Sequence, residues 1–358
     1  MKKISFCGIV FLFCAIVSLH AQHLEQYYAA ANGLSSAGLK TALAGIINPH
    51  HELSYDTLWQ CFYTTDLRSA GNYVWDMYSD CHFVYSNDQC GNYKNICDCY
   101  NREHSFPQSW FTSRSAMATD LHHIYPTDGK VNNMRGGYPL GECSSGTVYG
   151  LGKLGNCTFS GYSDVVFEPA DEYKGDFART YFYVVTCYEN EQTLWPSSAM
   201  INNTAYPSFN TWSLNLLLKW HRQDPVSNKE INRNNAVYAY QYNRNPFIDY
   251  PVLAEYIWGD SVGQPWNLLP TDDSTRIEEI AFTIDVYPNP FNDMLTINTN
   301  EPTAYQILDI CGRTLQKGVI ENGTQIDLSH LSNNVYCLLL TRQNGLKVYK
   351  KIVKQKKD

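Results

Sequence analysis

Hydrophobic residues recur at helical spacing in several segments of the first 260 residues. In the segment KGDFARTYFYVVTC, one helical face carries Phe177, Tyr181, Val184 and Val185, which predicts a helix buried in the core. The same kind of pattern predicts three more helices, at residues 24–47, 214–220 and 230–241. In the first of these, Ser35 or Ser36 can cap the Ala- and Leu-rich part.

From residue 284 onward the pattern changes to short runs in which apolar and polar positions alternate. The runs MLTINT, YQILDI, TQIDLS, VYCLLLT and KVYKKIVK are separated by turn residues such as Asn322-Gly323 and Asn344-Gly345. This predicts a small antiparallel β-sandwich at residues 284–358. The acidic, proline-containing segment 263–283 predicts a linker, so we expect an α+β chain whose first domain spans residues 23–262.

Between these regions, the pattern predicts a compact strand–strand–helix unit. Residues 102–110 are typical of a strand and turn, and residues 120–126 of a second short strand. Thr127 or Asp128 can then cap a helix that Gly136 and Gly137 end. We therefore expect a ββα unit, preceded by short strands and loops at residues 55–85.

The N-terminus has the layout of a secretory signal peptide. Lys2 and Lys3 precede an apolar run at residues 6–19, and Ala21 is a small residue suited to a cleavage site, so residues 1–22 are predicted to be removed. The run is short for a permanent span, and no later stretch reaches about 18 uncharged apolar residues. We expect an exported protein with no stable membrane span.

Cysteine usage agrees with export. Ten of the 12 cysteines remain after the leader, eight of them at residues 61–187. Even numbers of cysteines in an exported chain favour disulfides. The Gly- and Ser-rich residues 141–165 predict a surface loop closed by a disulfide between Cys143 and Cys157.

A zinc site is the alternative use of the cysteines. It would combine Cys90, Cys97 and Cys99 with His82. The C-x-C spacing of Cys97 and Cys99 is shorter than the C-x₂₋₄-C spacing of common zinc sites, so we favour disulfides.

Residues 101–137 concentrate the chemistry of the chain. Glu103 and the Asn132 amide offer oxygen ligands for a hard divalent ion, and a neutral His104 imidazole can activate water. An arginine such as Arg135 can contact a phosphate. These groups suit metal-assisted phosphodiester hydrolysis, although neighbouring strand residues point to opposite faces and need a local twist to meet. The net charge of −8 confines attraction for nucleic acid to a local basic site.

Each of these residues also has a purely structural interpretation. An isolated Glu-His pair is usually a surface ion pair or contains a histidine with ordinary hydrogen bonds, and Asn132 or Asn133 can simply cap a helix. His122 and His123 can be a packed aromatic pair or a pair of zinc ligands. Arg135 near a helix end is typical of a partner for the helix dipole. The combination within one short segment favours a site.

Three blocks of sequence carry a resemblance to a known family. The segments NREHSFPQSW, DLHHIYPTDGKVNNMRGGYPLGE and QYNRNPFIDYPVLAEYIW resemble the bacterial endonuclease I family of secreted, non-specific nucleases with a ββα-metal (His-Me finger) core. The resemblance covers roughly residues 25–260. It implies His104 as general base and one Mg²⁺, or Mn²⁺ or Ca²⁺ in its place, held by Glu103 and Asn132. It also implies 5′-phosphate products from DNA, with RNA as a further substrate.

The resemblance also suggests roles for residues around the site. Arg135 matches the family's arginine in the same helix, where it supports the site or contacts phosphate. Arg102, which replaces a tryptophan of better-known members, is also expected to contact phosphate, and Arg114 stands in for the phosphate-binding arginine of a longer insert. The residues expected to support the site are Asp120, His122, Asn243 and Asn245.

The C-terminal segment is similar to the sorting domains of the type IX secretion system. The residues that carry this resemblance are VYPNPFNDMLTI, IDLSHLSNNVYCLLL and the basic KKIVK. It implies the secretion machinery as a partner and a protein that is secreted or held on the cell surface. We expect this protein to be a monomer. Two other hypotheses remain open: a catalytically silent surface-attached binding protein, and a zinc phosphodiesterase on the same fold.

Overall fold

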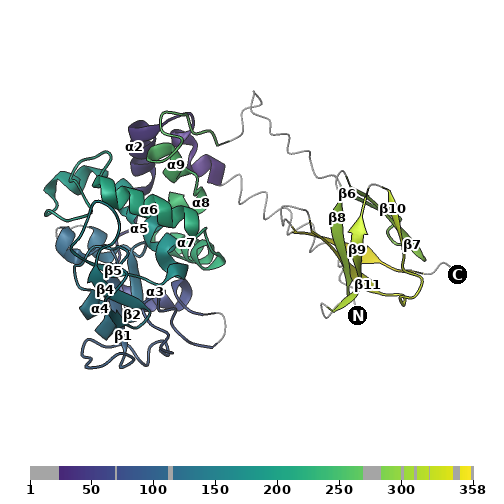
Figure 1. Ribbon diagram of the computed structural model, residues 1–358, viewed down its shortest axis with the longest axis horizontal. Helices are drawn as coiled ribbons and strands as arrows, with labels where there is room; N and C mark the ends of the chain where they lie inside the picture. Colours follow the sequence, from purple (N-terminus) through teal and green to yellow (C-terminus); the bar gives the residue numbers. More distant parts are fainter. Residues whose placement is uncertain are drawn as a thin grey trace. The chain divides into compact units, whose positions relative to one another are not determined.

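The chain consists of two compact units, Met1–Pro270 and Thr271–Asp358. The computed structural model describes residues 24–68, 71–111, 116–268, 284–299, 302–309, 313–321, 323–341 and 347–355. The expected signal peptide and most of the expected linker lie outside these residues. Figure 1 shows the elements of each unit.

Helix α5 (Lys174–Cys187) is the centre of the N-terminal unit, and every one of its residues is buried. The predicted face of Phe177, Tyr181, Val184 and Val185 lies wholly in the core, as its spacing indicated. Around α5 lie α2 (Ser36–Ile47), α6 (Thr211–Gln223), α7 (Asn228–Gln241), α8 (Pro246–Asp249) and α9 (Leu253–Ile257). The helices expected in the regions of α2, α6 and α7 are therefore confirmed.

The predicted linker starts later than expected, because the chain still packs on the N-terminal unit at Trp266. The Trp266 ring is 3% exposed, and its backbone pairs with Leu34. Gly33 donates its N–H to Trp266 O at 2.6 Å. Its φ of +76° is a backbone conformation that favours glycine. The segment that joins the two units thus begins after the buried tryptophan.

The expected ββα unit is present. Strand β1 (Tyr100–His104) pairs antiparallel with β2 (Ile124–Asp128), and α4 (Gly129–Arg135) follows at once. The Asp128 carboxylate accepts the Val131 N–H at 2.9 Å and so caps α4. Gly136, with φ +52°, ends the helix. In Figure 1, β1, β2 and α4 lie together at one end of the N-terminal unit.

Three local predictions were wrong. The segment expected to contain only short strands and loops includes helix α3 (Thr57–Thr65), which buries Leu58, Cys61, Phe62 and Thr65. The predicted surface loop at 141–165 contains two strands, β3 (Thr147–Tyr149) and β4 (Gly152–Asn156), which form a three-stranded antiparallel sheet with β5 (Val165–Glu168). The expected disulfide in this segment is also absent, since Cys143 and Cys157 are free, buried thiols.

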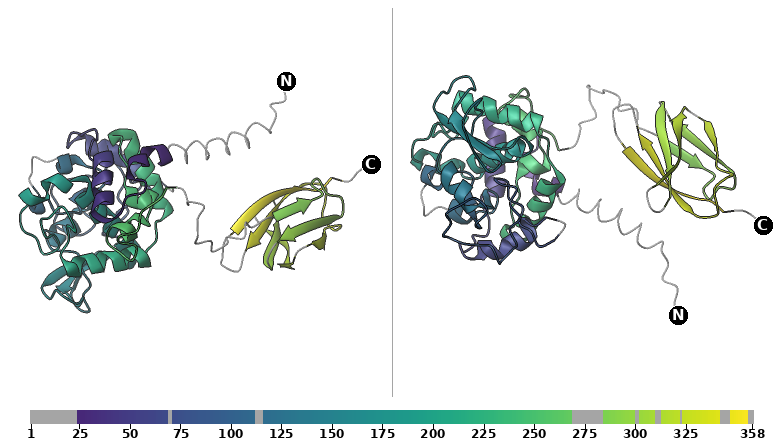
Figure 2. Two further views of the ribbon diagram at one scale, coloured as in Figure 1. Left: turned by 90° about the horizontal axis from the view of Figure 1, so that it is seen from above. Right: turned by 60° about the horizontal axis from the view of Figure 1, so that its bottom comes forward.

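The C-terminal unit is the predicted antiparallel sandwich, and Figure 2 shows it as strands only. One sheet has the order β10-β7-β6 (Thr324–Asp327, Met294–Thr299, Ile284–Tyr287). The other has the order β12-β11-β8-β9 (Lys347–Val353, Val335–Thr341, Thr303–Leu308, Thr314–Ile320). Both sheets contribute to one core, which includes Leu295, Ile297, Ile307 and Leu338. Strands β6 and β9 were not anticipated.

Candidate active site

A cavity of about 340 Å³ lies over the ββα unit. Glu103 and His104 from β1 and Asn132 from α4 all line it. The remaining lining residues are Tyr55, Tyr93, Asn101, Arg102, Pro107, Gln108, Ser109, Asn133, Gly136 and Gly137. The structure thus brings the three central residues of the sequence prediction to one place, although Glu103 and His104 are neighbours on a strand.

His104 is held so that one ring nitrogen is available for a proton. Its Nε2 lies 3.1 Å from Ala118 O. A carbonyl oxygen only accepts hydrogen bonds, so Nε2 carries the hydrogen and Nδ1 keeps its lone pair. Burial, reinforced by the nearby His123, lowers the pKa of His104 to about 4. The imidazole is therefore neutral near pH 7, the form that a general base requires.

The Glu103 carboxylate is buried and held from one side. Its Oε1 accepts the Tyr78 hydroxyl at 2.9 Å and lies 3.6 Å from Arg135 Nη1. Burial raises the pKa of Glu103 to about 7, although Arg135 and the Tyr78 hydrogen bond oppose that shift. The second oxygen, Oε2, has no hydrogen-bond partner among the described residues. A cation at that oxygen would offset the cost of burying the charge.

Asn132 offers the second oxygen ligand. Helix α4 places it in the cavity, where its amide nitrogen donates to Arg102 O at 3.4 Å. The amide oxygen therefore remains available. A carboxylate and an amide oxygen form a donor set for a hard divalent cation such as Mg²⁺, and these residues fit that ion.

Arg135 lies beneath the cavity rather than in it. Its side chain is 1% exposed, and its Nη2 donates to Ser105 O at 2.6 Å and to the Tyr181 hydroxyl at 3.0 Å. With Glu103 on its other side, the guanidinium ties the end of β1 to α5. Of the two roles implied for Arg135, these contacts favour support of the site.

Arg102 lies at the cavity wall with its guanidinium against two aromatic rings. Its central carbon is 3.6 Å from the Tyr55 ring centroid and 4.4 Å from that of Trp59. The side chain is 13% exposed, and its Nη1 lies 3.7 Å from an Asp56 carboxylate oxygen. Arg114, the third arginine expected to contact phosphate, lies outside the described residues.

The four residues expected to support the site lie in the interior, and none of them lines the cavity. Asp120 accepts the hydroxyls of Tyr183 and Tyr188, both at 2.8 Å. Burial alone would raise the pKa of Asp120, but nearby histidines and hydrogen bonds outweigh it and hold that pKa far below its usual range. His122 Nε2 lies 3.2 Å from Asn243 O.

The two asparagines fasten the last helices of the unit to its core. The Asn243 amide donates to Ile47 O at 2.9 Å and to the Tyr183 hydroxyl at 2.8 Å. Asn245 caps α8 through the Phe247 N–H at 3.0 Å. These contacts are those of structural residues behind the site.

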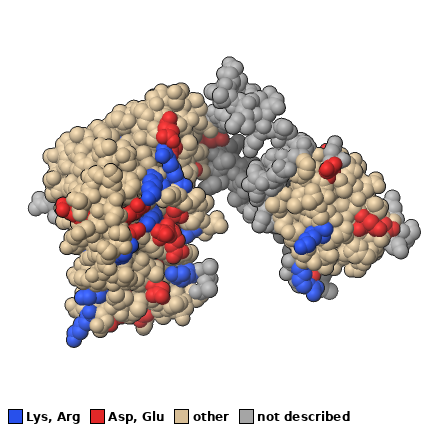
Figure 3. All heavy atoms as spheres, in the orientation of Figure 1, with Lys and Arg blue, Asp and Glu red and all other residues tan. Residues whose placement is uncertain are grey.

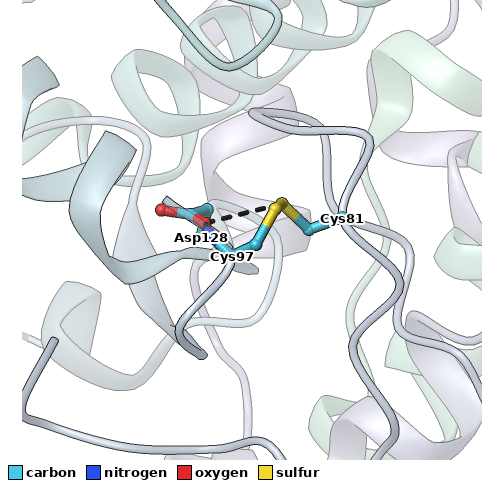
Figure 4. Close-up of side chains that lie close together, drawn as sticks. All are labelled: Cys81, Cys97 and Asp128. Atoms are coloured by element: carbon cyan, nitrogen blue, oxygen red, sulfur yellow. Dashed lines mark hydrogen bonds between the residues drawn. A yellow bond between two sulfur atoms is a disulfide. The ribbon is translucent and has the colours of Figure 1, made fainter. Parts of the chain in front are cut away.

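The structure does not support either zinc site considered from the sequence. Two disulfides, Cys81–Cys97 and Cys90–Cys99, use the cysteines, and the first lies beside Asp128 (Figure 4). In the described part of the chain, the only cluster of His, Cys, Asp or Glu side chains with metal-ligand spacing consists of Cys81, Cys97 and Asp128. The two sulfurs of this cluster are bonded to each other.

The adjacent histidines do not converge on one ion. His122 Nε2 faces Asn243 O, whereas His123 Nε2 lies 2.6 Å from Met117 O. Both rings are buried, at 2% and 0% exposure. They are packed interior side chains, which was one of the alternatives left open by the sequence.

Sequence reasoning missed two tyrosines of the site. The Tyr78 hydroxyl donates to the Glu103 carboxylate, and the Tyr55 ring packs on the Arg102 guanidinium at the cavity wall. The chain has 27 tyrosines, and nothing in their local sequence marks these two. Tertiary contacts alone distinguish them.

A neutral imidazole, a buried carboxylate and an amide oxygen around one cavity are the groups of a metal-assisted hydrolase. Comparison with known proteins gives the family. The Endonuclease I family model matches residues 35–252, and the chain belongs to that family. It is a nuclease of a family that depends on metal ions in general.

Two Bacillus proteins are similar over most of their length. An extracellular ribonuclease of Bacillus amyloliquefaciens is 38% identical over 241 residues, which cover 65% of this chain and 78% of that protein. An extracellular ribonuclease of Bacillus subtilis is 35% identical over 243 residues, with the same coverage. The Endonuclease-1 of Buchnera aphidicola subsp. Baizongia pistaciae is 26% identical over 133 residues, 37% of this chain and 46% of that protein.

The C-terminal unit matches a family model for a secretion system C-terminal sorting domain at residues 285–355. The protein is therefore exported, to the medium or to the cell surface, and the secretion machinery is a partner. Among the residues described here, no helix is both long and apolar enough to cross a bilayer.

Proposed function

We propose that this protein is a secreted endonuclease that hydrolyses phosphodiester bonds of nucleic acid without sequence specificity, with His104 as its general base. The observation that carries the proposal is the meeting of His104, Glu103 and Asn132 at one cavity. The available Nδ1 of His104 takes a proton from the attacking water.

Glu103 and Asn132 would hold one divalent cation, for which we propose Mg²⁺. Such an ion acts as a Lewis acid and relieves negative charge on the phosphate and the leaving oxygen. Tyr78 and Arg135 position the Glu103 carboxylate for that ligand role, because both bind its other oxygen. We expect cleavage to leave 5′-phosphate ends.

The substrate proposed is DNA, and RNA as well. Two relatives that share more than a third of the aligned residues are named ribonucleases, which supports RNA as a substrate of this chain too. The other hypotheses are less well supported. A silent binding protein has no need of three catalytic groups at one cavity, and a zinc phosphodiesterase built on His122 and His123 is disfavoured by their separate carbonyl partners.

The test is cleavage of supercoiled plasmid and of a single-stranded RNA by the purified, oxidised protein, with Mg²⁺ and with EDTA. We expect metal-dependent cleavage by the wild type and its loss, by about 10²-fold or more, in His104→Ala. His82→Ala is the matched control, since His82 is exposed and lies outside the cavity. Labelling of the product ends reports whether the phosphate is 5′.

Equal cleavage by the wild type and His104→Ala would contradict the assignment of the base. No cleavage by a folded, oxidised wild type would favour the silent binding protein. Zinc that stays bound through dialysis against a weak chelator would favour the zinc enzyme.

A further inference from the structure

Tyr55 forms part of the cavity wall, and Arg102 fixes its position. The Arg102 guanidinium packs on the Tyr55 ring, with 3.6 Å from its central carbon to the ring centroid, and its Nη1 donates to Tyr55 O at 2.7 Å. The same guanidinium packs on Trp59, at 4.4 Å from that ring centroid. Tyr55 is thus the exposed member of a stack of three side chains rather than a free loop residue.

The Tyr55 ring is also aligned with the proposed general base. Its plane lies within 11° of the His104 imidazole plane, with the two ring centroids 6.2 Å apart. Although Arg102 covers part of the ring, 42% of Tyr55 remains exposed. The Tyr55 ring is therefore flat, accessible and held in place by Arg102, and it lies close to the imidazole of the proposed general base.

The two described arginines at the cavity already have acidic partners, which leaves little of their charge for phosphate. Arg135 is buried against Glu103, and Arg102 lies close to the Asp56 carboxylate. The chain as a whole carries a net charge of −8. Phosphate attraction alone is therefore weak, whereas stacking of a base on an aromatic ring does not depend on charge and tolerates every base.

We propose that Tyr55 is the stacking platform for an unpaired nucleobase beside the scissile phosphate, so that the preferred substrate of this site is single-stranded nucleic acid. In a duplex each base is already stacked and paired inside the helix and cannot lie on Tyr55 without being extruded, which costs energy. This inference rests on the proposed nuclease function and specifies its substrate class.

The experiment uses oligonucleotides with a single cleavable phosphodiester between cleavage-resistant linkages. One single strand carries bases on both nucleotides that flank this bond, a second has abasic nucleotides there, and a third is the first strand in a duplex. The kcat/KM of the full-length protein with Mg²⁺ is measured on each, for the wild type, Tyr55→Leu, Tyr55→Trp and Tyr63→Leu. Tyr63 is the control because it is 57% exposed and lies outside the cavity.

We expect the wild type to cleave the base-bearing single strand faster than the abasic strand and the duplex. In Tyr55→Leu the ratio of base-bearing to abasic kcat/KM falls by about 5- to 150-fold, the range of a lost aromatic–base stack. Tyr55→Trp, which keeps a flat ring, and Tyr63→Leu keep the ratio of the wild type.

Two results would overturn the inference. An equal loss on base-bearing and abasic strands in Tyr55→Leu would mean that Tyr55 only supports Arg102 and His104. Unchanged kcat/KM values on all three substrates in Tyr55→Leu would mean that no base stacks there. Failure of the nuclease proposal looks different, because the wild type would then cleave none of the three substrates.

Discussion

The Arg135 guanidinium lies 3.6 Å from Glu103 Oε1, and the two side chains are 1% and 6% exposed. Arg135 lies beneath the cavity that Glu103 lines, and the Tyr78 hydroxyl donates to the same Glu103 oxygen. A buried charge that loses its partner costs far more than the pair contributes, because no water replaces the partner. The geometry of the proposed metal ligand thus depends on an arginine that solvent does not reach.

We therefore expect Arg135→Met to lower the free energy of unfolding by about 3–5 kcal/mol, measured by urea denaturation in EDTA. Adding Glu103→Gln to this variant should recover part of the loss, since no uncompensated charge then remains. Arg222→Met is the control, because the Arg222–Glu255 pair is 44% and 20% exposed and such pairs contribute about 1 kcal/mol or less. Equal losses in the two single variants would show that Arg135 is not a buried partner of Glu103.

The ββα unit was predictable because its signals are local. Asp128 before the helix and Gly136 after it fix where α4 begins and ends, whatever the rest of the chain does. The burial of α5 followed in the same way from its apolar spacing. Local pattern also placed the Glu-His pair on a strand, but it could not show that both side chains reach one cavity.

The sheet β3-β4-β5 was not predicted because a glycine in a sequence can indicate either a loop or a position where two segments pack closely. Gly152 and Gly155 suggested a loop, yet both lie inside β4. A Cβ on Gly152 would collide with the Phe167 ring, and one on Gly155 with Ser145 O. These glycines mark close packing of neighbouring segments, a requirement set by residues distant in the sequence. Tyr55 and Tyr78 were missed for the same reason.

Metal binding should increase the thermal stability of the folded protein. A ligand that binds only the folded state at 100 times its Kd stabilises it by about 2.7 kcal/mol, so saturating Mg²⁺ should raise the Tm of the wild type. We expect Glu103→Gln and Asn132→Leu to lose most of this shift, because each removes one of the two protein ligands. Asn87→Ala, an exposed residue outside the cavity, should keep it. Calorimetric scans with and without Mg²⁺ test this, and a full shift in Glu103→Gln would exclude the carboxylate as a ligand.

Stability should fall at acid pH through Glu168. Burial would raise its pKa, but the Cys143 N–H and the ammonium groups of Lys174 and Lys153 outweigh that effect and lower it to about 2. A carboxylate with a depressed pKa in the folded state contributes stability above its ordinary pKa of about 4.5, and this contribution is lost as pH falls toward 2.

Glu168→Gln should accordingly be less stable than the wild type at pH 7, by about 1 kcal/mol for these partly exposed pairs. Its free energy of unfolding should also change less steeply between pH 4.5 and pH 2. Urea denaturation at a series of pH values measures both quantities. Glu172→Gln, at an exposed position nearby, should follow the wild type. If the Glu168→Gln curve runs parallel to that of the wild type, the two lysines do not stabilise the folded state through this carboxylate.

Binding of nucleic acid should weaken with salt, but with a shallow slope. On the face shown in Figure 3, Lys and Arg are interleaved with Asp and Glu rather than gathered into a continuous basic surface. Each phosphate that the protein neutralises on a single strand adds about 0.7 to the slope of log K against log salt. With one local site and a net charge of −8, we expect a slope that corresponds to a few phosphates.

Anisotropy of a labelled single strand with the inactive His104→Ala variant, between about 50 and 200 mM salt, gives this slope. Lys130→Ala, in the first turn of α4 beside the cavity residues, should reduce the slope by about 0.7 if that ammonium meets one phosphate. Lys219→Ala should not change it, because Lys219 is paired with Glu142 at 2.8 Å. A slope equivalent to ten or more phosphates would instead require an extended basic surface, and would make charge rather than stacking the main source of affinity.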